Sequence, residues 1–206
     1  MDLEKIKQKF GDVYYANEDT FRLGINIKFT DHLAQRFKGK MVLETCTGGG
    51  FTTLSLAKYA NHVFTFEIDK KRIEDAIKNC KKAGVDNKIS FFNMDIHKIK
   101  GMEIKKVINA AFLDPDWDNV VSNYIYRFHN SMTKPKSDVL LKEMQEITDN
   151  ITLVQPPYID IGEFNGLKEH ELEKLYIDNE LALLCLHFGD LRNKARNTEY
   201  SVFDSK

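Results

Sequence analysis

The chain has 206 residues, of which 42% are hydrophobic and 30% are charged, and its formal net charge is −1. These totals are ordinary for a globular protein, and a charge near zero argues neither for nor against a polyanionic partner. No apolar run approaches the roughly 20 residues that cross a bilayer. The length predicts one domain over 1–206, with an N-terminal helical and loop segment over 1–38, a core over 39–192 and a tail over 193–206.

Cysteine and histidine usage argues against a metal site. The three cysteines are Cys46, Cys80 and Cys185; they form no CxxC pair, and the six histidines are scattered. We therefore expect a reducing compartment and no bound metal. The opening residues Asp2-Leu3-Glu4-Lys5 are unlike a signal peptide, so the prediction is a cytoplasmic protein with no membrane partner.

In chain order, the periodicity predicts helices and strands that alternate. The helices are expected at 5–10, from Thr30 as N-cap to Phe37, and at 51–59, 70–83 and 137–147. The strands are expected at 41–43, 63–66, 89–93, 107–113, 151–154, 172–177 and 181–188. This alternation predicts a doubly wound, mostly parallel, Rossmann-like α/β sheet of seven strands. Asp178-Asn179-Glu180 predicts a tight turn, so the last two strands form an antiparallel C-terminal hairpin.

Ligands of such sheets bind beyond the carboxyl ends of the strands, and acidic residues follow several of the predicted strands. The first lies in Glu44-Thr45-Cys46-Thr47-Gly48-Gly49-Gly50. Glycine lets a backbone approach a ligand closely, whereas a diphosphate disfavours a carboxylate beside the turn. A sulfonium or an ammonium group favours it. The segment therefore points to S-adenosylmethionine rather than to a dinucleotide, with Glu44, Cys46, Thr47, Gly48 and Gly50 as candidate contacts.

Two further acids follow the next strands. Glu67 ends the second strand, where a carboxylate can bind both ribose hydroxyls of the cofactor. Asp69 is expected to cap the following helix instead. Asp95, after the third strand, can accept a hydrogen bond from the adenine amine. Their neighbours Ile68 and Ile96 complete the predicted cofactor contacts.

The segment Leu113-Asp114-Pro115-Asp116-Trp117 follows the fourth strand and is the predicted catalytic segment. An exocyclic amine on a purine is a poor nucleophile, so catalysis depends mainly on positioning it. Asp114 and the Pro115 carbonyl can orient the amine, Asp114 also contacting the cofactor, while Trp117 stacks on the base. Gln155-Pro156-Pro157-Tyr158 follows the fifth strand and is interpreted as a structural turn or a wall of the substrate pocket.

Taken together, these residues resemble class I S-adenosylmethionine-dependent methyltransferases, and in detail the trimethylguanosine synthase family. That family methylates the N2 amine of a guanine in RNA, typically in a 7-methylguanosine cap. The resemblance extends from about Phe10 to Arg192 and is most specific over Leu175–Leu181 and Phe188-Gly-Asp-Leu191. It also includes Ile147-Thr-Asp-Asn150.

The chain departs from the family in its catalytic segment, which usually reads Ser-Pro-Pro-Trp-Gly-Gly-Pro. Here it reads Asp114-Pro-Asp-Trp-Asp-Asn119, so an acid replaces the serine while the tryptophan is kept. A cationic 7-methylguanine would suit the added acids, and a less charged acceptor would avoid repulsion between those acids and phosphates. Tyr124, Tyr126, Arg127 and Phe128 favour unpaired RNA bases, although a buried face is equally compatible with them.

The resemblance implies an S-adenosylmethionine-dependent methyltransferase acting on the guanine N2 amine of RNA. Two alternatives stay open. One is an amine methyltransferase for another nucleobase, in transfer RNA for example, or for a small molecule. The other is a catalytically silent module that binds cofactor or RNA. The sequence does not specify the acceptor RNA, the number of methyl groups added or the oligomeric state.

Overall fold

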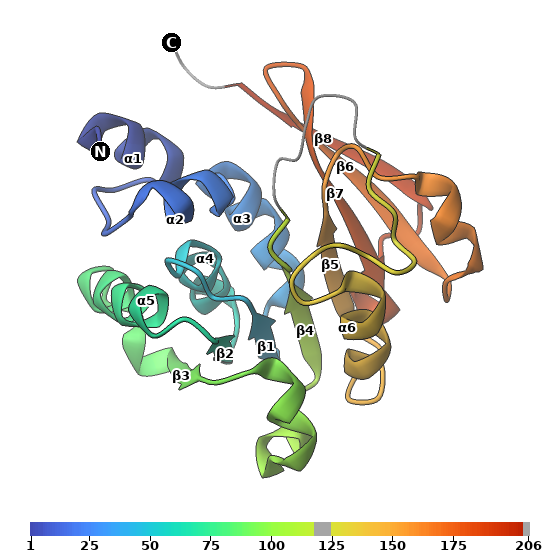
Figure 1. The fold of residues 1–206 in the computed structure, drawn as a ribbon, viewed down its shortest axis with the longest axis horizontal. Coiled ribbons are helices and arrows are strands. Elements are labelled where there is room, and N and C mark those ends of the chain that lie inside the picture. The colour runs from blue at the N-terminus through green and yellow to red at the C-terminus, as the bar shows by residue number, and fades with distance from the viewer. Residues whose placement is uncertain (118–124, 204–206) are drawn as a thin grey trace. The chain divides into compact units, whose positions relative to one another are not determined.

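The computed structural model describes residues 1–117 and 125–203. The chain forms two compact units, 1–110 and 111–206. The first runs from blue to green in Figure 1 and the second from green to red.

The first unit is built on three parallel strands in the order β3-β2-β1. They are β1 (Met41–Thr45), β2 (His62–Glu67) and β3 (Ile89–Asn93). Helix α4 (Phe51–Tyr59) connects β1 to β2, and α5 (Lys70–Lys82) connects β2 to β3. These strand and helix positions confirm the predictions within one or two residues. Because the strands are parallel, their carboxyl ends lie at one edge of this part of the sheet.

Three short helices precede the sheet, namely α1 (Leu3–Phe10), α2 (Glu18–Leu23) and α3 (Ile27–Ala34), and a 3-10 turn follows over Gln35–Phe37. Phe10 stacks on Phe51 of α4 with ring centroids 3.5 Å apart, and Phe21 packs edge-on against Phe10. The aromatic residues of the N-terminal segment therefore form part of the core that covers α4.

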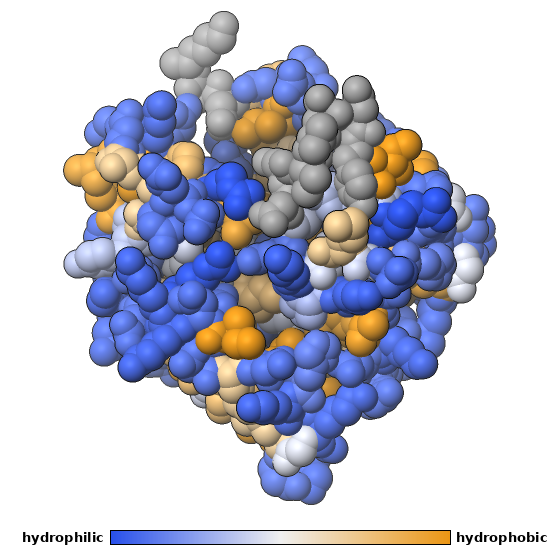
Figure 2. All heavy atoms as spheres, viewed as in Figure 1, coloured by the Kyte–Doolittle hydropathy of each residue, from blue (hydrophilic) through white to orange (hydrophobic). Residues whose placement is uncertain are grey.

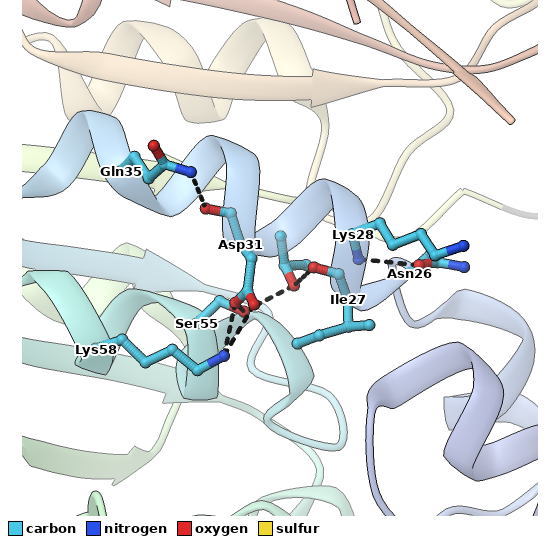
Figure 3. A network of polar contacts seen from close by, with 8 residues as sticks. Asn26, Ile27, Lys28, Asp31, Gln35, Ser55 and Lys58 are labelled. Atoms are coloured by element: carbon cyan, nitrogen blue, oxygen red, sulfur yellow. Dashed lines mark hydrogen bonds and ion pairs between the residues drawn. The ribbon is translucent and has the colours of Figure 1, made fainter. Parts of the chain in front are cut away.

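Thr30 was predicted as an N-cap, and this prediction was wrong. The N-cap of α3 is Asn26, four residues earlier, whose side chain accepts a hydrogen bond from the Lys28 amide. Thr30 lies inside the helix, 1% exposed, and its hydroxyl contacts the Ser55 hydroxyl of α4 at 2.8 Å. Figure 3 shows the adjoining network, in which Asp31 accepts hydrogen bonds from Ser55 and Lys58. Thr30 thus joins α3 to α4 instead of starting a helix.

The strand predicted at 107–113 is shorter in the structure. Strand β4 spans Ala110–Leu113, and its four residues are fully buried. Two 3-10 helices, Ile96–Gly101 and Glu103–Lys106, precede it, and a third, Asp86–Lys88, precedes β3. Val107 is 50% exposed, so its apolar side chain was wrongly interpreted as the start of a buried strand.

The second unit orders its strands β4-β5-β7-β6-β8. The strands β5 (Ile151–Gln155), β6 (His170–Ile177), β7 (Glu180–Phe188) and β8 (Asn197–Val202) join β4. Only β7 is antiparallel to its neighbours, as the predicted hairpin requires. Helix α6 (Ser137–Met144) connects β4 to β5, and 3-10 helices lie at Ile161–Gly166 and Gly189–Leu191. Helix α6 ends three residues before the predicted boundary.

The hairpin turn has the chemistry that the sequence predicts. Asp178 and Asn179 have φ values of 50° and 66°, the left-handed conformation that Asp and Asn tolerate best after glycine. Gly189, in the Phe188-Gly-Asp-Leu191 segment, has a φ of 62°. A Cβ there would lie 2.5 Å from the Asn150 side chain. Asn150 accepts a hydrogen bond from the Asp190 amide, so two segments that resemble the family contact one another.

The prediction of seven strands was wrong, because the described residues hold eight. The additional strand, β8, lies within the predicted tail. It is held by Glu171 of β6, whose buried carboxylate accepts hydrogen bonds from the Asn193 amide and the Thr198 hydroxyl, both at 2.5 Å. The alternating exposure of β8 agrees with an edge strand.

Gly50 is expected to be indispensable for the packing of α4 on α5. Its φ is 80°, and a Cβ there would lie 2.9 Å from the Ala76 Cβ. Gly50→Ala should therefore lower the free energy of unfolding by about 2 to 4 kcal/mol. Denaturant unfolding of the purified protein measures the change.

Gly84→Ala is the matched control for this prediction. Gly84 has a φ of 70° and no neighbour within 4 Å of the added Cβ, so the substitution carries the backbone cost alone. Equal losses of stability in the two variants would show that the contact with Ala76 does not matter.

Candidate functional site

The turn between β1 and α4 has an unusual backbone. Cys46, Gly48 and Gly50 all have positive φ, at 59°, 53° and 80°. The Gly50 amide donates to the Thr47 carbonyl at 2.8 Å, which closes the turn. Cys46 adopts a conformation that costs a non-glycine residue of order 1 kcal/mol or more. Strain of this kind is often found where a backbone is shaped to meet a ligand.

Glu67 organises this turn. One of its carboxylate oxygens accepts from the Gly48 amide and the other from the Asp69 amide, both at 2.9 Å. The side chain of Asn93 donates to the carbonyls of Glu67 and Ile68, which joins the end of β3 to the end of β2. The carboxyl ends of these strands and the glycine turn are therefore one hydrogen-bonded assembly. Asn93 was not among the predicted residues, although its place at the end of β3 is a usable signal.

Glu44 lies deeper than the sequence suggests. It is 2% exposed within β1, and its carboxylate accepts a hydrogen bond from the Thr53 hydroxyl of α4 at 2.6 Å. Burial raises the pKa of Glu44 to about 7, although hydrogen bonds from Thr53 and Thr65 oppose that rise. Thr47 is also buried, and its hydroxyl contacts that of Thr65 at 2.5 Å.

The remaining predicted cofactor residues of this unit differ in exposure. Ile68 is 72% exposed, whereas Ile96 is 6% exposed. Asp69 caps α5 through the Arg72 amide, as predicted. Asp95 is partly exposed and accepts from the His97 amide at the start of a 3-10 helix. An N-cap uses only part of the hydrogen-bonding capacity of a carboxylate, so Asp95 can still accept from a ligand.

Asn79 is a residue of this unit that sequence reasoning missed. It is fully buried in α5, and its side-chain amide donates to the carbonyls of Gly49 and Tyr15 at 2.9 Å. Its oxygen accepts from the Tyr15 amide at 2.8 Å. Asn79 therefore ties the aromatic N-terminal segment to the glycine turn. A polar residue on the apolar face of the predicted helix was the available signal.

The predicted catalytic segment belongs to the second unit. Asp114 and Trp117 are partly exposed, whereas Pro115 between them is buried. The backbone of Asp116 pairs with that of Lys134 through two hydrogen bonds of 2.8 and 2.9 Å. Backbone pairing with Lys134 therefore holds the segment three residues after the end of β4.

Tyr126 connects Trp117 to the segment after β5. Its ring lies edge-on to the Trp117 ring, with centroids 6.3 Å apart and planes at 77°. The Tyr126 amide donates to the Tyr158 carbonyl at 2.7 Å. Tyr158 itself is 68% exposed, whereas Gln155 is buried, and the interpretation of Gln155–Tyr158 as a structural turn or a wall of a substrate pocket stays a prediction. Asp118, Asn119 and Tyr124 of the predictions lie outside the described residues.

The described part of the chain holds no group of three or more His, Cys, Asp or Glu side chains that could bind a metal ion. Within 1–117 and 125–203, none of the helices combines the length and apolar character needed to cross a bilayer. Figure 2 shows one face on which hydrophilic residues dominate and apolar groups are small and separate.

The glycine turn, the acids after successive parallel strands and the antiparallel strand β7 define a class I methyltransferase fold. A family model described as RNA cap guanine-N2 methyltransferase matches residues 39–180. The chain therefore belongs to this family, whose cofactor is S-adenosylmethionine, and the resemblance inferred from the sequence is confirmed.

A curated relative and solved structures give further comparisons. A tRNA/tmRNA (uracil-C(5))-methyltransferase of Campylobacter lari is 29% identical in an alignment 172 residues long, which covers 70% of this chain and 49% of the relative. The chain thus spans about half the length of that relative. A Porphyromonas gingivalis W83 protein that is described as a methyltransferase superposes with a TM-score of 0.74 at 14% identity, over 91% of this chain and 47% of that one.

Two other solved structures share the fold. The tRNA (m1A58) methyltransferase TrmI of Aquifex aeolicus has a TM-score of 0.60 at 18% identity, over 89% of this chain and 75% of its own. TrmK of M. capricolum, solved with S-adenosylhomocysteine, has a TM-score of 0.58 at 10% identity, over 84% of this chain and 70% of that one. At these identities the comparisons support the Rossmann-like fold and carry no residue roles.

The raised pKa of Glu44 predicts a pH-dependent stability. The folded value of about 7 lies above the ordinary 4.5, so the folded state binds more protons between these values. The free energy of unfolding should therefore fall by about 3 kcal/mol as the pH rises through that window. Glu44→Gln keeps an acceptor for the Thr53 hydroxyl and should remove this dependence. Urea unfolding at several pH values measures both proteins.

Other titrating groups contribute equally to wild type and Glu44→Gln, so the difference between the two curves isolates Glu44. If the two curves ran parallel from pH 4 to pH 8, the buried carboxyl would not be the titrating group.

Proposed function

We propose that this protein transfers a methyl group from S-adenosylmethionine to the exocyclic N2 amine of a guanine in RNA. The observation that carries the proposal is the Asp114–Trp117 segment, which leaves a buried strand and presents a partly exposed tryptophan braced by Tyr126. Membership of the RNA cap guanine-N2 methyltransferase family supports it. The single-domain organisation and the cytoplasmic location stay predictions of the sequence.

The residues of the first unit fit S-adenosylmethionine. The glycine turn over Cys46–Gly50 is proposed to present backbone to the methionine end, and the Glu67 carboxylate, which accepts from the Gly48 and Asp69 amides, is proposed to bind the ribose hydroxyls. Ile68 offers an exposed apolar contact for the adenine ring, and Asp95 is the proposed acceptor for its amine. Ile96, being buried, supports this surface from within. Glu44, buried within β1 and hydrogen-bonded to Thr53, is proposed to support the turn rather than to contact the cofactor directly.

The acceptor residues act by positioning. The bound cofactor supplies an electrophilic methyl group on a sulfonium. The Asp114 carboxylate and the Pro115 carbonyl accept the two N–H bonds of the guanine amine and so aim its lone pair. Methyl transfer would break the sulfur–carbon bond of the cofactor, form a nitrogen–carbon bond and leave one excess proton on the amine. The Asp114 carboxylate is the acceptor next to that proton, and Trp117 stacks on the ring.

A second candidate substrate is a base amine of transfer RNA. The similarity to the Campylobacter lari enzyme, which acts on tRNA and tmRNA, favours it. Methylation of uracil C5 itself is less compatible with the residues at hand. A uracil carbon becomes nucleophilic only after a thiolate adds to the ring. Cys80 and Cys185 are buried, and the partly exposed Cys46 lies in the glycine turn that is proposed to meet the cofactor. Burial raises the pKa of the Cys80 thiol well above its ordinary value, which makes it inert.

Transfer of a labelled methyl group to cellular RNA, followed by digestion to nucleosides, tests the proposed function. We expect label in N2-methylated guanosine. Asp114→Ala should lower turnover by about a hundredfold, and Trp117→Ala should raise KM for RNA by about tenfold. Asp149→Ala is the control, because this acid of the same unit is 75% exposed and forms a surface ion pair with Lys168.

The position of the label separates the two candidate substrates. Label next to 7-methylguanosine indicates a cap, and label within transfer RNA indicates the second candidate. Wild-type turnover in Asp114→Ala, with the fold intact, would refute the catalytic assignment. Cofactor binding without transfer to any RNA would indicate a small-molecule acceptor or a silent binding module.

A further inference from the structure

Glu163 makes an unusual set of contacts for a carboxylate near the surface. It lies in the 3-10 helix over Ile161–Gly166 and its side chain is only 8% exposed. One oxygen accepts from the amides of Phe128 and His129, at 2.7 and 2.9 Å. The other oxygen pairs with the guanidinium of Arg127. Three consecutive residues, Arg127 to His129, thus converge on a single carboxylate.

This segment, Ile125–His129, also contains Tyr126. Both polar groups of the Tyr126 backbone are paired: its amide donates to the Tyr158 carbonyl at 2.7 Å, and its carbonyl accepts from the Asp160 amide at 3.0 Å. Exposure alternates along the segment, so the Tyr126 ring points inward at 4% exposure. There it meets the edge of Trp117. The orientation of Trp117 is therefore coupled to the placement of this segment.

We infer that Glu163 is a positioning residue for the acceptor base, acting through Tyr126 on Trp117. The inference rests on the proposed role of Trp117 in stacking on that base. Glu163 touches neither the base nor the cofactor in this scheme. It fixes the backbone on which Tyr126 stands, and Tyr126 fixes the tryptophan.

The backbone contacts of Glu163 matter more than its ion pair. Arg127 is 65% exposed, and ion pairs in contact with water contribute little. Charge-assisted hydrogen bonds to two backbone amides are stronger and directional. Packing of Phe164 against Phe128, with ring centroids 5.7 Å apart, holds the same two segments together independently. Loss of the carboxylate should therefore loosen the segment without unfolding the unit.

Trp117 is the only tryptophan in the sequence, so tryptophan fluorescence reports on the environment of this residue alone. In the cofactor-free protein, Glu163→Ala should raise acrylamide quenching of Trp117 by about twofold. Glu163→Gln keeps one oxygen for the two amides and should stay near wild type. Arg127→Gln removes only the ion pair and should also stay near wild type. Thermal unfolding followed by far-UV circular dichroism verifies that each variant is folded.

Glu169→Ala is the matched control. Glu169 pairs with Arg192 at 2.8 Å in the same unit, is 69% exposed and has no amide contact like those of Glu163. It should leave Trp117 quenching unchanged. In the methyl-transfer assay, Glu163→Ala should raise KM for RNA, as Trp117→Ala does but by less than about tenfold, with an unchanged KM for S-adenosylmethionine, and Glu163→Gln should restore a KM for RNA near that of wild type.

Unchanged quenching in a folded Glu163→Ala would overturn the inference, as would an equal effect of Arg127→Gln. The quenching needs no substrate, so it separates the two proposals. If Glu163→Ala changes quenching while wild type methylates no RNA, then Glu163 does position Trp117 and the proposed function is wrong.

Discussion

The carboxylate of Glu67 is the contact on which the rest of the first unit depends. It accepts two backbone amides, those of Gly48 in the turn after β1 and Asp69 before α5. Two loops that emerge from neighbouring strands are thereby held by one side chain. Because the carboxylate is 5% exposed, the paired amides would otherwise lie in a poorly hydrated place at a substantial cost. The positive φ angles of the turn are stable because this contact and the packing around Gly50 determine them together.

Much of this arrangement could be predicted from the sequence. Glycines, short apolar runs and helix periodicity located α4 and β3 at their observed boundaries and α5 to within one residue, since these signals are local. The burial of the Glu44 side chain could not be predicted, because the alternation of residues along a strand indicates which face a side chain lies on but not how far that face is from solvent. Strand β8 was missed for a related reason, because it depends on Glu171, a partner remote in sequence. The cap of α3 is local, since Asn26 accepts from the Lys28 amide, but Thr30 also has a residue type that caps helices, and its actual contact with the remote Ser55 could not be predicted.

In the second unit, the sequence identified the residues proposed to meet the acceptor but not those that hold them. Asp114 and Trp117 were predicted from chemistry that a purine amine requires. Tyr126 was an ambiguous aromatic, and Glu163 carried no signal, since its partners are 34 and 35 residues away. Supporting contacts of this kind are set by tertiary structure, and only the structure reveals that one carboxylate organises the segment beside Trp117.

The Asp114–Trp117 segment carries negative charges, and the chain paired with it carries positive ones. Asp114 and Asp116 make the segment itself acidic, whereas Lys134 and Lys136, on the chain paired with it, are exposed. Phosphates would be repelled by the acids and attracted by the lysines, while an electron-poor base would favour the acids. A ligand with its base at one end and its phosphates at the other can place the base near the acids and the phosphates near the lysines. A nucleotide within RNA has that form, which is why the added acids are compatible with an RNA substrate.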